Sequence, residues 1–320
     1  DVVMQAYEDL SNRVAGGVAL MLGCCGAISE WAGRYEMTEK VNEQLKQELA
    51  KLGDPIIIAG CPSCMKQLKE SIGVHVIGIW EILKEIGLPQ QAKGLEIPVA
   101  IHDACGARGD AQTQDMIRQL LSDMGCIVED TEYSRDLSPC CGYGGLTAYA
   151  NKDMAAKMTE KCLERSDAPY ITYCMACRDR FVREGRESRH ILELLYGDNA
   201  CNMPDISEKR YNRLVLKEKL LKNIWNEELM MEKKDYTVAY TEDAIRMMDE
   251  RMILKSDVER VLSDYRENQE AIFDEETKEL VTRSRLGNVT FWVRFIETEE
   301  GYLVRRAYSH RMNIMKRVGQ

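Results

Sequence analysis

Five cysteines in the middle of the chain have the residue type and spacing of a metal centre. Three motifs, HDACGARG, SPCCGYGG and YCMAC, supply Cys105, the adjacent Cys140 and Cys141, and the CxxC pair Cys174 and Cys177. Thirty-four residues separate Cys105 from Cys140, and thirty-two separate Cys141 from Cys174. A tetrahedral zinc ion takes four nitrogen or sulfur ligands, so five thiols in this order indicate a larger, polynuclear centre.

A shorter copy of this arrangement lies upstream. GCCG places Cys24 and Cys25 side by side, and after thirty-five residues CPSC supplies Cys61 and Cys64. Four thiols suit either zinc or a four-ligand iron–sulfur cluster. A fifth cysteine at the spacing of the second copy would precede residue 1. We therefore expect either a fragment of a longer polypeptide or a first site that departs from the pattern.

Zinc, iron–sulfur and uncomplexed thiols are the alternatives for both sets. Adjacent cysteines rarely direct both sulfurs at one ion without strain, whereas they can serve two irons of an open cluster. This favours iron–sulfur chemistry at the second set. At the first set, zinc and an empty or disulfide-bonded site remain alternatives to iron–sulfur. Cys126, Cys162 and Cys201 fall outside the repeat, and we expect them to be core or surface thiols.

The overall composition of the chain argues against several classes of protein. The 320 residues are enough for a sizeable core divided over two or three domains. Twelve cysteines in a chain of this length are too dilute for a small disulfide scaffold, so the paired spacings indicate metal chemistry in a reducing compartment. The net charge of −10 argues against a nucleic-acid partner, and no apolar run is long enough for a membrane span. We expect a cytoplasmic redox protein.

The elements around the cysteines are expected to alternate between strand and helix. Helices are predicted at 2–13, 36–52, 65–72, 111–125, 151–167 and 175–185, and strands at 16–22, 55–60, 97–102, 126–134 and 168–174. Residues 75–87 and 188–197 each read as a strand followed by a helix. Such alternation predicts an α/β fold with parallel sheets. We expect two pseudo-repeated cysteine-rich halves, residues 1–95 (N-terminally incomplete) and 96–203, with facing cysteine loops.

The C-terminal part differs from the cysteine-rich halves in its predicted order of helices and strands. A linker helix is predicted over 204–235, followed by an α+β accessory domain over 236–320. In that domain two helices, the second opened by a capping box of Ser256 and Glu259, precede three strands at 279–285, 288–297 and 301–309. Short connections between these strands predict an antiparallel meander.

The pattern C–x(30s)–CC–x(30s)–CxxC resembles the cysteine-rich CCG domain found in the B subunit of heterodisulfide reductase. Related copies occur in iron–sulfur subunits of glycolate, lactate and anaerobic glycerol-phosphate oxidation systems. The resemblance covers roughly residues 10 to 200. It implies a non-cubane 4Fe–4S cluster at the second cysteine set, and a second such cluster if the first set is completed upstream. His102, Asp103 and Arg108 match the family's H-D-x-C…R neighbourhood, with Ala104 where the family usually has proline.

Two of these neighbouring residues are candidates for tuning the cluster. His102 would act by a hydrogen bond to a sulfur, and Arg108 by offsetting cluster charge or binding an acidic substrate. The alternatives are a satisfied loop histidine and a surface ion pair. We expect His75, His190 and His310 to be structural.

The tail resembles, more distantly, small domains allied to RelE/BrnT-type toxins. Ala244, Arg246, Met247, Arg251, Ile253 and Val258 roughly follow their pattern H-A-x-x-R-M-x-x-R-x-I-x-x-x-x-V. Asp243 replaces the histidine, which argues against nuclease activity. We expect an accessory or docking role.

By the CCG resemblance, the protein is expected to be an oxidoreductase subunit that reduces a small-molecule disulfide at its iron–sulfur centres. Electrons would come from a ferredoxin-type iron–sulfur subunit and a flavin subunit or domain, because the chain shows no flavin, GxGxxG or P-loop motif. One alternative is a non-catalytic electron-transfer module of a larger flavin- or quinone-linked assembly. The other is a zinc-stapled scaffold that docks through residues 205–320.

Overall fold

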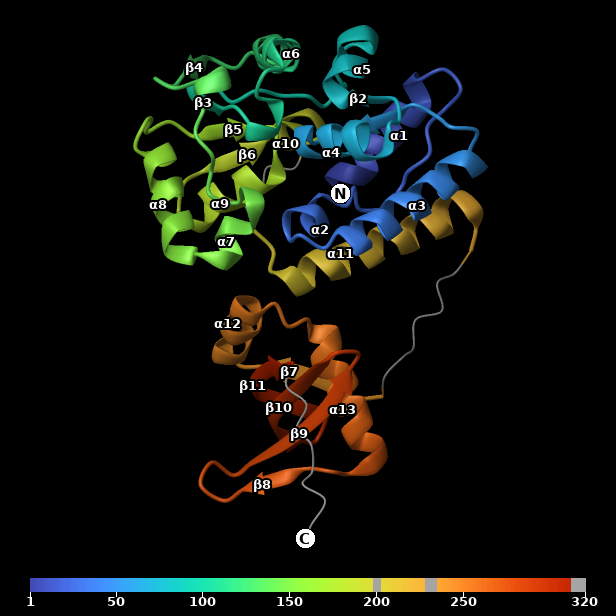
Figure 1. Ribbon diagram of the computed structural model, residues 1–320, viewed down its shortest axis with the longest axis vertical. Coiled ribbons are helices and arrows are strands. Elements are labelled where there is room, and N and C mark those ends of the chain that lie inside the picture. The colour runs from blue at the N-terminus through green and yellow to red at the C-terminus, as the bar shows by residue number, and fades with distance from the viewer. Residues whose placement is uncertain (198–202, 228–234, 312–320) are drawn as a thin grey trace. The chain divides into compact units, whose positions relative to one another are not determined.

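The computed structural model describes residues 1–197, 203–227 and 235–311 (Figure 1). The chain divides into two compact units, Asp1–Met203 and Pro204–Gln320. The first unit contains both cysteine-rich segments. No helix in the described residues is long and apolar enough to cross a membrane.

The second cysteine-rich segment is built on a parallel sheet with the strand order β4-β3-β5-β6. Apolar runs form its central strands, where Val99, Ala100 and Ile101 are completely buried. The strands are β3 (Val99–His102), β4 (Val128–Asp130), β5 (Tyr170–Thr172) and β6 (Ser188–His190). The helices are α6 (Ala111–Asp123), α7 (Thr147–Ala150), α8 (Lys152–Leu163), α9 (Met175–Arg183) and α10 (Ile191–Tyr196), with 3-10 turns at Cys105–Ala107, Arg135–Leu137 and Gly144–Leu146. This confirms the predicted α/β class.

The first segment repeats this plan with a smaller sheet, in which β1 (Ile57–Ala59) pairs in parallel with β2 (Val76–Gly78). Its helices are α1 (Val2–Arg13), α2 (Ala27–Trp31), α3 (Tyr35–Lys51), α4 (Pro62–Gln67) with a π-helical turn at Leu68–Ile72, and α5 (Ile79–Ile86). The strand predicted at 16–22 is wrong. That apolar run has no hydrogen-bonding neighbour among the described strands, and Ala19 and Met21 on it are exposed.

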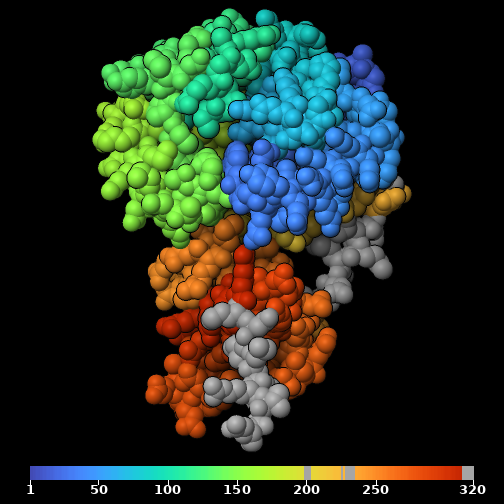
Figure 2. All heavy atoms as spheres, viewed as in Figure 1, coloured from blue at the N-terminus to red at the C-terminus, as the bar shows by residue number. Residues whose placement is uncertain are grey.

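The two segments share a single hydrophobic core. Trp80 on α5 meets Tyr173 beyond β5 edge to face, with ring centroids 6.1 Å apart, and both are almost fully buried. At the other end of the unit, Asp9 of α1 accepts a hydrogen bond of 3.2 Å from the hydroxyl of Tyr196 in α10. In the space-filling view, the blue-to-cyan first segment and the green second segment meet along a continuous seam (Figure 2). The cysteine-rich halves are therefore parts of one packed body.

The C-terminal unit is a mixed sheet with the strand order β7-β11-β10-β9-β8, with helices packed on its core. The predicted meander is confirmed: β9 (Glu279–Leu286), β10 (Val289–Thr298) and β11 (Gly301–His310) pair antiparallel. The sequence reading missed β8 (Ile272–Asp274) and β7 (Thr237–Tyr240), and β7 pairs in parallel with β11. The helices are α11 (Ile206–Leu220), continued as a π-helical turn to Trp225, α12 (Glu242–Arg251) and α13 (Lys255–Asn268).

Two details of this unit differ from expectation. The helix predicted over 204–235 ends at Trp225, since Asn226 has left-handed backbone angles and terminates it; residues 228–234 lie outside the described part. The second helix begins at Lys255, and the Asp257 carboxylate accepts from the Leu254 amide at 3.0 Å, so the capping box assigned to Ser256 and Glu259 is wrong. Three apolar residues of the toxin-like pattern, Ala244, Ile253 and Val258, are core residues, whereas Met247 is half-buried.

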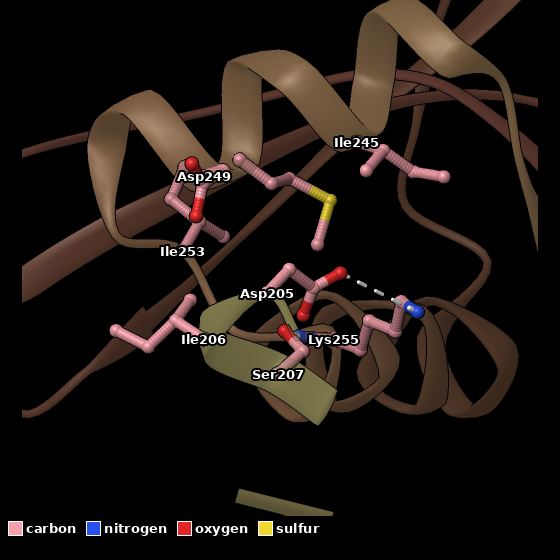
Figure 3. A pocket seen from close by; sticks show the side chains of 8 residues that line it. Asp205, Ile206, Ser207, Ile245, Asp249, Ile253 and Lys255 are labelled. Carbon is pink, nitrogen blue, oxygen red and sulfur yellow. Dashed lines mark hydrogen bonds and ion pairs between the residues drawn. The ribbon is translucent and has the colours of Figure 1, made fainter. Parts of the chain in front are cut away.

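A small pocket lies where the start of α11 meets α12 and α13 (Figure 3). The Lys255 amide donates to the Ser207 hydroxyl at 2.9 Å, and the Lys255 ammonium lies 4.0 Å from the Asp205 carboxylate. The pocket holds about 10 Å³, the room of one water molecule. These contacts join α11 to the rest of the C-terminal unit and leave no space for a substrate.

Candidate metal centre

The nine cysteines of the two motif sets lie next to one another in one continuous row of thiols. Each member contacts its neighbours in the order Cys24, Cys25, Cys64, Cys61, Cys174, Cys177, Cys141, Cys140, Cys105. The contact between Cys61 and Cys174 joins the first set to the second. The fold therefore brings all the predicted ligand cysteines to one place.

The row is open to solvent at both ends and closed in its middle. Cys24 and Cys105 are exposed, whereas Cys141, Cys174 and Cys177 are buried. A bound group would therefore be enclosed by protein at the junction of the sets and approachable from each end.

Parallel strands deliver the cysteines. Cys61 follows β1 and is the residue before α4, and Cys174 occupies the same position between β5 and α9. Both CxxC motifs thus cross a strand-to-helix junction, where the free amides of the helix start favour a thiolate. Cys105 follows β3, the neighbour of β5 in the sheet. The carboxyl ends of parallel strands are a usual place for a site in such sheets.

Small residues allow the two segments to approach closely at the row. A Cβ atom added at Gly106 would lie 2.8 Å from the Ser63 amide nitrogen, inside the first CxxC motif. A Cβ atom at Gly60, directly before Cys61, would lie 3.1 Å from the Leu192 side chain. The loops of Cys105 and of Cys61 therefore meet backbone to backbone.

Hydrogen bonding separates the thiols into acceptors and donors. Hydrogen bonds from Cys24 and Cys64 lower the pKa of Cys25 to about 3. Those from Cys174 and Cys64 lower the pKa of Cys61 to about 2. Bonds from Cys105 and Cys141 likewise lower the pKa of Cys140. Each thiol with a lowered pKa lies between two other thiols of the row.

The donor chemistry of the row fits a sulfur-ligated polynuclear group. Thiolates are the ligands of iron–sulfur clusters and of structural zinc. Among the described residues, no three Cys, His, Asp or Glu side chains are arranged around a single ion. A row of pairwise contacts, rather than a cage around one point, suits a centre with several metal atoms.

The two proposed tuning residues occupy different environments. His102 is buried at the end of β3, with its ring edge-to-face on Phe181 at 4.8 Å, and its Nε2 has no hydrogen-bond partner in the described protein. Burial lowers the pKa of His102 to about 4. Arg108 donates to the Ser138 carbonyl at 2.7 Å, which holds the loop that leads to Cys140. A direct effect of either residue on a cluster remains a prediction.

Four of the remaining cysteines and histidines are buried or hydrogen-bonded (Cys126, Cys162, His190 and His310), whereas His75 is exposed. Cys126 is buried, and Cys162 is buried with its thiol donating to the Cys140 carbonyl at 3.5 Å. Cys201 lies outside the described residues. His190 accepts from the Leu192 amide at 3.2 Å, and His310 accepts from the Trp292 indole at 2.9 Å.

The sequence reading assigned no role to Asp103 beyond the motif match. In the structure it is the hydrogen-bonding centre of the second segment, with partners on Arg118, Arg135 and Tyr173. The available signal was a charged residue placed directly after a short strand that is apolar up to His102 and buried at every position. Such a residue is buried by its position and requires partners.

Both cysteine-rich segments are similar to a known protein family. Residues 16–69 and 99–181 match the model of the CCG cysteine-rich domain family. Both cysteine-rich segments therefore match the CCG domain family. The matched residues include all nine cysteines of the row and lie within the first structural unit.

Two curated relatives share part of the chain. An uncharacterised iron–sulfur protein of Methanococcus maripaludis is 27% identical over 48% of this chain and 32% of its own length. An uncharacterised iron–sulfur protein of Methanocaldococcus jannaschii is 26% identical over 41% of this chain and 27% of its own length. The alignments thus span about a third or less of these relatives. No solved structure gives a significant match.

Proposed function

We propose that the CCG unit holds an iron–sulfur centre and reduces a small-molecule disulfide, as a redox protein resembling the B subunit of heterodisulfide reductase. The continuous thiol row, joined between Cys61 and Cys174 and exposed at Cys24 and Cys105, carries this proposal. The relatives described as iron–sulfur proteins support the cofactor class.

The residues of this chain would bind and orient the group. Cysteines of the second set, Cys105, Cys140, Cys141, Cys174 and Cys177, would hold a non-cubane 4Fe–4S cluster. Cys24, Cys25, Cys61 and Cys64 would hold a second cluster or zinc. A bound cluster supplies one-electron chemistry, and two such centres together provide the two electrons that cleave one S–S bond.

The proposed reaction balances with an external donor. Two electrons and two protons convert one disulfide to two thiols. A ferredoxin-type iron–sulfur subunit and a flavin subunit or domain would supply the electrons. The half-exposed Cys140 and the exposed Cys105 lie at the end of the row where a substrate can approach.

A non-catalytic electron-transfer module is the second candidate. It is favoured by the burial of Cys141, Cys174 and Cys177, which would keep a substrate away from the middle of the row. A zinc-stapled scaffold that docks through residues 205–320 is the third candidate.

Metal analysis separates these functions. Protein purified without oxygen is assayed for iron, zinc and acid-labile sulfide per chain. About eight irons without zinc support two clusters, and about four support one. Zinc without sulfide contradicts the redox proposal.

Serine variants then test the ligands. Replacing Cys140 or Cys141 is expected to remove the iron bound by the second cysteine set and to abolish disulfide reduction, while Cys126→Ser, a matched change outside the row, retains both. Retention of iron but no turnover with any disulfide, alongside electron transfer to an acceptor dye, favours the electron-transfer module.

A further inference from the structure

A single buried carboxylate connects the three loops that carry the second cysteine set. Asp103 follows β3 directly and stands two residues before Cys105, and its side chain is completely buried. Arg118 of α6 pairs with both of its oxygens, at 3.0 Å from Nη1 and 2.8 Å from Nη2. This bidentate pair fixes the plane of the carboxylate.

The other two donors to Asp103 adjoin the remaining cysteine motifs. The hydroxyl of Tyr173, the residue before Cys174, donates to Oδ1 at 2.9 Å. The backbone amide of Arg135 donates to Oδ2 at 2.6 Å, from the loop that leads to Cys140. Each oxygen thus accepts one bond from Arg118 and one from a cysteine-bearing loop.

These partners are far apart in the sequence. The pairing of β3 with β5 already brings Asp103 close to Tyr173, whereas the Arg135 loop belongs to no strand and is tied to Asp103 by the hydrogen bond. Asp103 is 70 residues from Tyr173 and 32 residues from Arg135. A buried charge is tolerated only when it is paired and hydrogen-bonded, so the carboxylate requires all of these donors at once. The consequence is a fixed relative position of the three loops.

We propose that Asp103 is the positioning residue of the metal centre, setting the distances between Cys105, the Cys140–Cys141 pair and Cys174 before any metal binds. This deepens the proposed function and rests on it. Asp103 does not contact the bound group in this role; it acts through Tyr173 and the Arg135 loop.

The test measures thiol protection in the full-length, reduced, metal-free protein. Each cysteine is alkylated with iodoacetamide, and its rate is followed by mass spectrometry of peptides. In Asp103→Asn only one acceptor oxygen remains and the negative charge that pairs with Arg118 is lost, so the three loops are held less tightly. We expect the buried Cys141 or Cys174 to react about tenfold faster.

Two further variants serve as controls for the alkylation rates of Asp103→Asn. Asp130→Asn removes the other carboxylate bound by Arg118, at a half-exposed site, and is expected to leave both rates within about twofold of wild type. Tyr173→Phe removes one bond only, and is expected to release Cys174 while Cys141 stays protected. Cys126, buried in the core outside the row, reports global unfolding.

Unchanged rates at Cys141 and Cys174 in Asp103→Asn overturn the proposal. If Asp103→Asn unfolds and Cys126 reacts as well, Tyr173→Phe becomes the test. Faster alkylation of Cys174 alone in Tyr173→Phe supports the proposal, and an unchanged rate at Cys174 overturns it. Because the assay needs no metal, it is independent of whether the centre holds iron. In iron-loaded protein, Asp103→Asn is expected to alter the electron paramagnetic resonance signature, whereas Asp130→Asn is not.

Discussion

The thiol of Cys61 in the first cysteine-rich segment lies next to the thiol of Cys174 in the second. Both residues stand between a strand and the first turn of a helix, so the two CxxC motifs meet through equivalent positions. The two cysteine sets are therefore neighbours. An electron could pass directly between groups bound to the two sets, without an intervening part of the protein.

This contact predicts a specific cross-link. In metal-free Cys64→Ser/Cys177→Ser protein, which lacks the competing CxxC partners, diamide is expected to oxidise Cys61 and Cys174 to a disulfide. Their adjacency favours this pair over thiols in other parts of the unit. Peptide mapping without reductant detects the product.

The control for the cross-link is the same background with Cys61→Ser, which should yield no product containing Cys174 and the first domain. If Cys61 were recovered only in disulfides with Cys24 or Cys25, the junction between the two sets would be refuted.

The sequence predicted most of the elements near the site, because short apolar runs followed by glycine or cysteine mark strand ends. Strands β1, β3 and β5 and the helices after them were placed this way. The same reasoning failed at 16–22, since an apolar run does not reveal whether a partner strand exists to complete its hydrogen bonds.

Only part of the arrangement of the site could be predicted from the sequence. Motif spacing grouped the cysteines into two sets, yet neither spacing nor composition contains the contact between Cys61 and Cys174. The hydrogen bonds of Asp103 could not be predicted for the same reason, because they join residues up to 70 positions apart. Such contacts depend on the packed core rather than on local pattern.

Gly142, directly after the cysteine pair, is expected to tolerate no side chain. It has φ +90°, and an added Cβ would lie 2.5 Å from the Ala155 carbonyl oxygen in α8. Gly142→Ala therefore combines left-handed backbone strain with a steric clash, and should cost about 3 kcal/mol of unfolding free energy. Urea denaturation of the metal-free protein measures this.

Gly109→Ala is the matched control. Gly109 has φ +81° but no atom within 4 Å of an added Cβ, so only the backbone strain of about 1 kcal/mol applies. Equal losses in the two variants would show that the approach of Ala155 has no energetic role.

His102 should make stability fall in mild acid. Burial lowers its pKa to about 4 from a usual value of 6.5. The unfolded chain therefore takes up a proton below pH 6.5 while the folded protein does not, and stability is lost as the pH falls from 6.5 toward 4. The full loss is about 3 kcal/mol.

His102→Gln removes this titration. Its unfolding free energy should decline less than that of wild type between pH 6.5 and 4, with the remaining decline due to groups such as His190, whose burial also lowers its pKa to about 4. Parallel pH profiles for wild type and variant would contradict the assignment.

The C-terminal unit should unfold without disturbing the cysteine row. Phe295 is completely buried there, edge-to-face with Tyr265 at 4.9 Å and with Tyr302 at 5.4 Å. Phe295→Ala should cost about 3–5 kcal/mol within this unit, because the aromatic cluster cannot close around the cavity. Hydrogen exchange read by mass spectrometry should show faster exchange in β9–β11 alone.

The reciprocal variant is Phe181→Ala in the CCG unit, where Phe181 is equally buried and meets Tyr170 at 5.1 Å. It should speed exchange in β3 and β5 and expose Cys174 to alkylation, with β9–β11 unchanged. Each unit has its own hydrophobic core, so the two losses should be separable. If either change loosened both units to the same degree, they would form one cooperative body, and residues 204–320 would contribute to the stability of the metal centre.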